Sequence, residues 1–183
     1  MMIRDMRFNI YSRAACWLLL ALMCGAVAGC ESAKEKDPKK FSKRDQASLR
    51  LHLEVNRDGQ ENNGPVTIGR ESPFEMNVEK QPFVTEFQIE KASVVDDMGG
   101  FAISVQFDKQ GTFLLEQYTT GHKGRRIGIV AEFGQMRWIA APMITKRVGD
   151  GLFVFTPDAT REEAERIVSG LNRMAFLVKK GRK

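Results

Sequence analysis

Residues 101–120 read FAISVQFDKQGTFLLEQYTT, and this stretch decides the fold class. Its first part alternates apolar and polar residues with a period of two, which is typical of a strand with one buried face. Asp108 then offers a side chain that can cap a helix N-terminus. After it the apolar spacing becomes that of one helix face, with Gly111, Leu114, Leu115 and Tyr118. The stretch therefore predicts a strand followed directly by an amphipathic helix over 108–120.

The helix pattern returns near the end of the chain. Thr160 and Glu163 have the spacing of a capping box, in which each side chain binds the backbone amide of the other residue. Behind them, one helix face is formed by Ala164, Ile167, Val168 and Leu171. This segment predicts a second amphipathic helix over 160–173.

Short alternating or apolar segments surround these helices and predict strands: 49–55, 66–69, 74–78, 101–107, 127–133, 136–140 and 152–155, with a further short apolar run at 92–95. Thr85 can cap a short helical turn that reaches Ile89. Two helices with one apolar face each must cover one face of a mainly antiparallel sheet. We therefore expect an α+β fold, a two-layer sandwich with both amphipathic helices on one face of a mainly antiparallel sheet.

The N-terminal segment has the layout of a secretory signal. Residues 15–30 read ACWLLLALMCGAVAGC, and Arg4, Arg7 and Arg13 precede them. A charged start, a short apolar run and small residues before a cut define such signals. The apolar run is short for a membrane span, which needs about 20 residues. An ordinary signal peptide, or a short anchor with an incidental cysteine, is the alternative.

The last four residues of that segment, Val27-Ala28-Gly29-Cys30, resemble the lipobox of bacterial lipoproteins. The resemblance implies that residues 1–29 are removed and that Cys30 carries the lipid, with acyl chains such as palmitate. In that family an Asp after the lipidated cysteine retains the protein at the inner membrane. Glu31 stands there instead, so we expect a lipoprotein of the outer membrane that faces the periplasm.

The predicted mature chain has three parts. Residues 30–48 are a lipidated N-terminus and a charged, disordered tether, with a membrane-contacting basic segment as the alternative. Residues 49–177 form a single α+β domain, and residues 178–183 are a basic tail. The chain contains only three cysteines, Cys16, Cys24 and Cys30, so the mature domain is predicted to have no disulfide framework. Part of the formal charge of +5 belongs to the signal, and this disfavours a nucleic-acid partner.

Four stretches in the second half have a recognisable order and spacing: Thr85, Ile89 and Ala92; residues 101–120; GRRIGIVAEFGQMRWIAAPMI at 124–144; and GDGLFVFTPDATREEAERIVSGLN at 149–172. Together, residues 84–172 resemble the head subdomain of the large periplasmic domain of SecD, a subunit of the bacterial protein-export machinery. The resemblance implies a fold and contacts with protein or peptide. SecD also has six membrane helices and uses the proton gradient, for which this chain shows no counterpart. Gly128 stands where that family usually has Ala.

Catalytic and metal-binding patterns are weak. The chain has only two histidines, His52 on the polar face of a predicted strand and His122 in a loop. A zinc site needs three or four ligands, and a serine triad would need one of these histidines. Asp96 and Asp97 precede two glycines and are explained by a turn. We therefore expect no enzyme activity, no cofactor and no metal.

Two functions remain. The first is a lipid-anchored periplasmic module that binds protein or unfolded polypeptide without catalysis and is accessory to protein export. The alternative is a structural or scaffolding lipoprotein that docks to a fixed envelope assembly. Phe133, Met136 and Trp138 flank the predicted 127–140 hairpin tip and are the candidate contact residues, although core packing explains Trp138 as well.

Overall fold

The computed structural model describes residues 46–57 and 59–181. The predicted signal peptide, the lipobox residues Val27, Ala28 and Gly29, the lipid attachment residue Cys30 and most of the predicted tether lie outside these residues. The elements follow the chain in this order: β1 (Ser48–Leu53), β2 (Asn63–Ile68), β3 (Phe74–Glu79), η3 (Glu86–Gln88), β4 (Ile89–Asp97), β5 (Gly100–Phe107), α2 (Lys109–Gly121), β6 (Ile127–Glu132), β7 (Met136–Ala140), β8 (Leu152–Phe155) and α3 (Arg161–Gly181).

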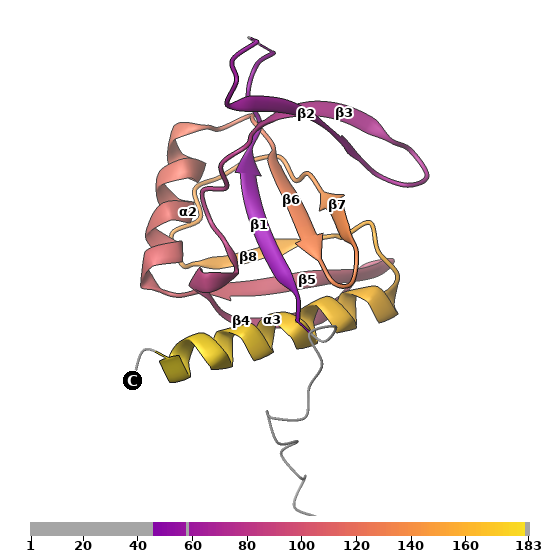
Figure 1. The fold of residues 1–183 in the computed structure, drawn as a ribbon, viewed down its shortest axis with the longest axis vertical. Helices are drawn as coiled ribbons and strands as arrows, with labels where there is room; N and C mark the ends of the chain where they lie inside the picture. The colour runs from indigo at the N-terminus through magenta and orange to yellow at the C-terminus, as the bar shows by residue number, and fades with distance from the viewer. Residues whose placement is uncertain (1–45, 58, 182–183) are drawn as a thin grey trace, which may run out of the picture. The chain divides into compact units, whose positions relative to one another are not determined.

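The strands of the described residues form three antiparallel sheets: β1–β6–β7, β2–β3 and β4–β5–β8. Figure 1 shows the strands β1, β6 and β7 crossing those of the β4–β5–β8 sheet, with α2 on one side and α3 running along β4. With two helices beside antiparallel sheets, the predicted α+β class is confirmed.

The main core lies between the two three-stranded sheets and both helices. Leu115 of α2 and Ile167 of α3 are fully buried in the same apolar cluster as Ile103 and Val105 of β5. Because these β5 side chains all point to one face, both helices cover the same face of the β4–β5–β8 sheet. The opposite face of that sheet carries Leu152 and Val154, which are exposed.

The predicted caps form as the sequence pattern indicates. Asp108 accepts a hydrogen bond from the Gly111 amide at 2.9 Å and starts α2. Glu163 Oε2 accepts from the Thr160 amide at 2.9 Å, while Thr160 Oγ1 accepts from the Glu163 amide at 3.2 Å, which completes the capping box of α3. A Cβ at Gly111 would lie 2.8 Å from Gln88 Cβ, so only glycine lets α2 approach η3 this closely.

Several boundaries differ from the prediction, among them β2, which begins at Asn63 and not at 66, and β4, which runs from Ile89 to Asp97 and not over 92–95. Helix α3 continues to Gly181 and not to 173, because Ala175 extends its buried face beyond Leu171. Part of the expected basic tail is therefore helical, and Lys179 in it pairs with Glu90 at 2.9 Å. At the other end, Ala47 is buried and packs against α3, so the folded part begins ahead of 49 and the predicted tether is shorter.

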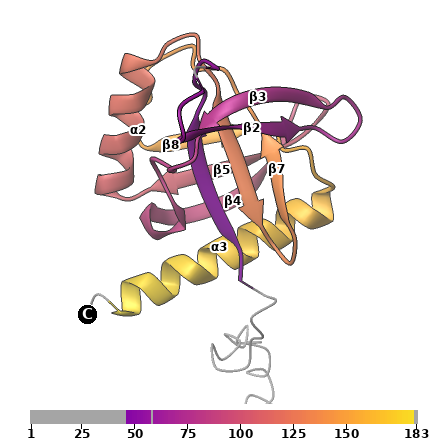
Figure 2. The same cartoon turned by 45° about the horizontal axis from the view of Figure 1, so that its top comes forward.

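A second, smaller core lies on the outer face of the β1–β6–β7 sheet. The β2–β3 hairpin crosses over β1, β6 and β7 in Figure 2 and covers part of that face. Its buried members are Ile68, Met76 and Val78, with Trp138 packed against them. His52 is buried beneath the hairpin, where its Nδ1 donates to the Glu79 carbonyl at 2.8 Å. His52 lies on the face of β1 opposite the main core, as predicted, but that face is covered there because the later β2–β3 hairpin folds over it.

Candidate functional site

The three predicted contact residues do not share a surface. Phe133 is buried in the main core, and Trp138 is half-buried in the small core with its ring 5.1 Å from that of His52. Met136 alone of the three is well exposed. The hairpin tip therefore cannot offer Phe133 and Trp138 to a partner, and the structure corrects this part of the prediction.

The residues considered for catalysis have structural partners. Asp96 pairs with Arg161 of α3, and Asp97 Oδ1 accepts from the Met98 amide at 2.8 Å within the β4–β5 turn. His122 Nδ1 lies 3.1 Å from the Tyr118 carbonyl at the end of α2. Within residues 46–57 and 59–181, no three His, Cys, Asp or Glu side chains are grouped to hold a metal ion.

A half-buried acidic side chain joins three elements. Glu163 Oε2 lies 3.1 Å from Arg70 Nη2 and 3.2 Å from Arg137 Nη2, so it ties the loop after β2 and strand β7 to the start of α3. Burial alone would raise the pKa of Glu163. The Thr160 amide and the two guanidinium groups outweigh burial and hold the pKa below its usual value. The carboxylate of Glu163 is thus held by groups of the protein itself, which indicates a structural role for this cluster.

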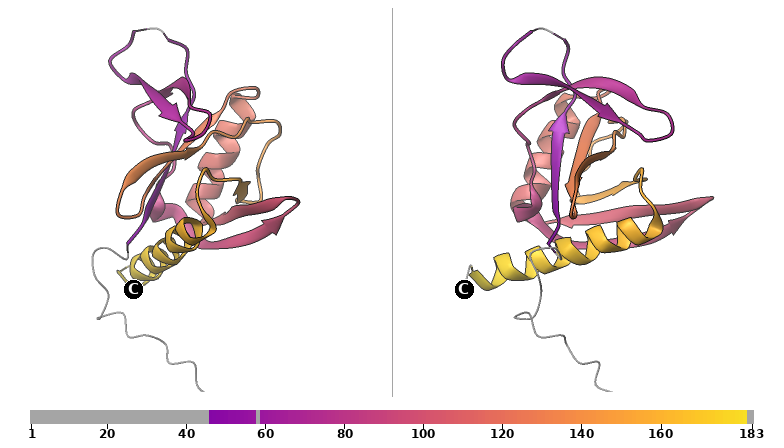
Figure 3. Two further views of the ribbon diagram at one scale, coloured as in Figure 1. Left: turned by 90° about the vertical axis from the view of Figure 1, so that its right-hand side faces the viewer. Right: turned by 45° about the vertical axis from the view of Figure 1, so that its right-hand side comes forward.

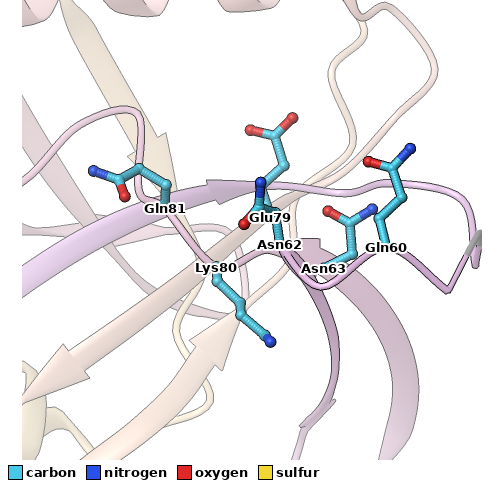
Figure 4. Close-up of a pocket in the computed structure, with 6 residues that line it drawn as sticks. All are labelled: Gln60, Asn62, Asn63, Glu79, Lys80 and Gln81. Carbon is cyan, nitrogen blue, oxygen red and sulfur yellow. The ribbon is translucent and has the colours of Figure 1, made fainter.

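One pocket of about 380 Å³ is lined by residues with polar or charged side chains. Its lining residues lie at the base of the β2–β3 hairpin: Gln60, Asn62, Asn63, Glu79, Lys80 and Gln81. Figure 4 shows these side chains pointing in different directions, with Lys80 directed away from Glu79. Lys80 Nζ donates to the Glu61 carbonyl at 2.5 Å. The side chains do not converge on one point, so they do not form a ligand site.

The groove beside β8 has a different character, because apolar side chains make up much of its lining. It lies between β8 and the segment 142–148 and has a volume of about 380 Å³. Its lining residues come from α2, β6, the segment 142–150 and β8: Thr119, Ile127, Pro142, Met143, Ile144, Thr145, Lys146, Val148, Asp150, Leu152, Phe153 and Val154. Leu152 is 44% exposed, Val154 is 49% exposed and Met143 is 50% exposed. Large apolar side chains that gather at a hollow are a feature of contact sites. We therefore define the β8 groove by these lining residues as the candidate functional site.

Strand β8 is also an edge strand. In the described part of the chain β8 pairs with β5 alone, and its second edge faces the groove. The view at the right of Figure 3 shows β8 as a short strand at the margin of its sheet. An open edge presents backbone N–H and C=O groups that can hydrogen-bond to another extended chain. The groove thus combines apolar contact with an unused backbone edge.

The family is established by comparison with known sequences. The sequence profile described as "SecDF, P1 head subdomain" matches residues 61–178. The chain belongs to this family. The match includes and extends the 84–172 stretch in which the resemblance to SecD was noted, and that resemblance is confirmed. It also covers the whole β8 groove and both helices except the end of α3.

Solved SecDF structures share the fold of this P1 head domain. One, a membrane component SecDF that enhances protein export, has a TM-score of 0.51 at 20% identity over 70% of this chain and 63% of its own chain. A second, SecDF in a super-membrane-facing form, has a TM-score of 0.52 at 22% identity over 69% of this chain and 19% of its own. The chain thus spans less than two thirds of either. No curated protein matches the sequence.

Two features of the P1 head domain become clear from the structure. A Cβ at Gly128 would lie 2.9 Å from both Met76 Cε and Trp138 Cζ3, so glycine at this position leaves room for the small core. Among the described residues, no helix is long and apolar enough to cross a membrane. The sequence signal of the β8 groove was the alternation of Leu152 and Val154 with Phe153 and Phe155, which marks a two-faced strand but not its open edge.

Proposed function

We propose that this chain is a non-enzymatic, lipid-anchored module that binds polypeptide in the periplasm and is accessory to protein export. The observation that carries the proposal is its membership of the SecDF P1 head family over residues 61–178. The SecDF of a solved relative is a membrane component that enhances protein export. The exposed apolar side chains of the β8 groove support a role in contacting polypeptide.

The binding half of this proposal is tested with an unfolded polypeptide. The full chain, purified in detergent, is mixed with a fluorescent, reduced and carboxymethylated protein that cannot refold. Saturable binding in fluorescence anisotropy is expected, with modest affinity and little dependence on sequence. Absence of binding, together with stoichiometric purification of one folded envelope partner, contradicts this function and favours the scaffolding alternative.

The anchoring half of the proposal rests on the lipobox. Val27-Ala28-Gly29 directs cleavage, and Cys30 carries acyl chains that hold the chain at the outer membrane, since Glu31 follows it. Two or more acyl chains give stable anchoring, because each buried methylene contributes about 0.8 kcal/mol. Intact-mass analysis is expected to show a lipid-modified Cys30 at the mature N-terminus, and Cys30→Ser is expected to remove that mass and release the chain from membranes. An unmodified Cys30 in the wild type contradicts the anchor.

A further inference from the structure

The two edges of the β4–β5–β8 sheet differ in whether another part of the protein covers their backbone groups. At the β4 edge, the Asn172 side chain binds both backbone groups of Ala92, at 2.7 Å to its amide and 2.8 Å to its carbonyl. Natural sheets commonly cover their edges in such ways to prevent pairing with other chains. At the β8 edge, Leu152–Phe155 contains neither a charged residue nor a proline, and β5 is its single strand neighbour among the described residues.

The register of the ladder identifies the groups that β8 presents. Phe107 donates to the Gly151 carbonyl at 3.0 Å, and Val105 lies opposite Phe153. Bonded and non-bonded pairs alternate in an antiparallel ladder. Phe153 and Phe155 therefore bond to β5, whereas the backbone groups of Leu152 and Val154 point away from it.

One of these outward groups already has a partner. The Leu152 amide donates to Asp150 Oδ1 at 3.1 Å. The Leu152 carbonyl and both the amide and the carbonyl of Val154 remain directed along the open edge. An acceptor, a donor and a second acceptor spaced along a strand match the backbone of an extended peptide, and a folded helical partner cannot satisfy them.

We propose that the β8 groove binds an extended polypeptide segment as an added strand, paired with Leu152 and Val154. This inference rests on the proposed function and names the form in which the polypeptide is bound. The added strand places alternate side chains over Leu152 and Val154 on the outer sheet face and against Met143 and Pro142 in the groove. Apolar or β-branched side chains on both faces of the segment therefore fit the site.

Charge at the groove wall defines the flanks of that segment. Lys146 lines the groove and is exposed, while the acidic residue of the groove lining, Asp150, accepts a hydrogen bond from the Leu152 amide at 3.1 Å. Lys146 forms no ion pair within residues 46–57 and 59–181, whereas its neighbour Arg147 pairs with Glu116. An unpaired cation on this wall of the groove attracts acidic residues next to the apolar stretch and repels basic ones.

Lys146 also argues against a second copy of this chain as the occupant. Pairing of two copies through β8 would bring Lys146 of both chains to one edge, which like-charge repulsion disfavours. It would also unite strands of four residues, which bury little area. An unfolded segment with acidic flanks avoids the like-charge repulsion, and it can be long enough to contact the whole groove.

The experiment uses backbone methylation, which removes a single hydrogen-bond donor from a peptide. A fluorescent peptide of about ten residues, with alternating Val and Thr and two Glu at each end, is titrated with the full chain in detergent. Because a strand pairs through every second residue, two peptides are compared, one N-methylated at the odd positions and one at the even positions. One of them is expected to bind at least 10-fold more weakly, while the other keeps the affinity of the unmodified peptide.

Protein variants address the same edge. Val154→Pro removes the outward amide and is expected to weaken binding at least 10-fold, whereas Val154→Thr keeps it and is expected to bind within about twofold. Phe113→Ala, at an exposed site on helix α2 outside the groove lining, is the control. Replacing the four Glu by Lys is expected to weaken binding several-fold at low salt. The peptide comparison uses the wild-type chain and so does not depend on the folding of any variant.

The outcomes separate the site from the function. Equal binding of the two methylated peptides overturns strand addition at β8. Binding of the unfolded protein that is unaffected by Val154→Pro overturns the site but leaves the proposed function standing. Failure to bind any polypeptide overturns both. Dimerisation of the wild type that Val154→Pro abolishes, and that excess peptide does not reverse, overturns the proposal in favour of self-pairing.

Discussion

Asn172 of α3 binds the backbone of Ala92 in β4 with both ends of its side-chain amide, accepting from its N–H at 2.7 Å and donating to its C=O at 2.8 Å. The side-chain amide thus makes the pair of hydrogen bonds that a neighbouring strand would make, and it joins residues eighty positions apart. The helix packs on the sheet face through Ile167 and Leu171 and also covers the sheet edge through Asn172. This contact explains why β4 is protected while β8 is open.

Replacing this amide should weaken the domain. Asn172→Ala leaves the Ala92 amide and carbonyl without their partner, and unpaired polar groups of this kind cost about 1–3 kcal/mol. The free energy of unfolding from urea denaturation is expected to fall by this amount. Lys180→Ala, an exposed change on the same helix, is the control and should stay within about 0.5 kcal/mol of the wild type. A loss no greater than that of the control contradicts the role given to Asn172.

Gly128→Ala should disturb the small core. The added methyl would lie 2.9 Å from the Trp138 ring and 3.2 Å from Val78 Cγ1, and overpacking of this kind costs about 1–3 kcal/mol. Trp138 fluorescence is expected to shift in the folded state as the ring moves. Gly121→Ala in α2 is the matched control, since nothing lies within 4 Å of its added Cβ. It should be neutral or stabilising by about 0.5–1 kcal/mol, and equal destabilisation by both changes would refute the steric explanation.

Glu163 should make stability sensitive to acid. Its folded pKa lies below the ordinary value, so its contribution is fully present above the unfolded pKa of about 4.3 and is lost as pH falls through the folded value. Glu163→Gln keeps the capping box geometry but loses the charge facing Arg70 and Arg137. The difference in unfolding free energy between wild type and Glu163→Gln should be greatest near pH 7 and shrink below pH of about 4. A difference that stays constant with pH contradicts this account.

His52 should add a second pH dependence at milder acidity. Burial lowers its pKa, and the hydrogen bond to the Glu79 carbonyl offsets only part of the effect. In the unfolded chain the His52 imidazole therefore becomes protonated near pH of about 6.5, whereas in the folded chain it stays neutral at that pH. Stability is full above that pH and decreases as pH falls towards the folded pKa. Thermal unfolding of wild type and His52→Gln at pH 7.5 and 5.5 should show the larger loss in the wild type, and identical losses would disprove it.

Local patterns predicted most of the elements. The alternation in 101–107, the Asp108 cap and the Thr160–Glu163 box each depend on residues within a few positions of one another, and all three form as expected. The end of α3 was harder to place, because Phe176 and Leu177 are exposed and only Ala175 continues the buried face. The candidate contact residues were harder still, because the pattern of a strand does not tell which of its faces another element will cover.

Periodicity and capping act over one or two turns of chain, so they were enough to predict most strands and helices, their caps and the α+β class. Three features appear only once the chain is folded: the division of the strands into three sheets, the packing of Phe133 and Trp138 against the cores, and the open edge of β8 beside a groove. The reason is physical. Burial and edge pairing depend on contacts between segments far apart in the chain, such as Asn172 with Ala92 and His52 with Glu79, and no local pattern encodes them.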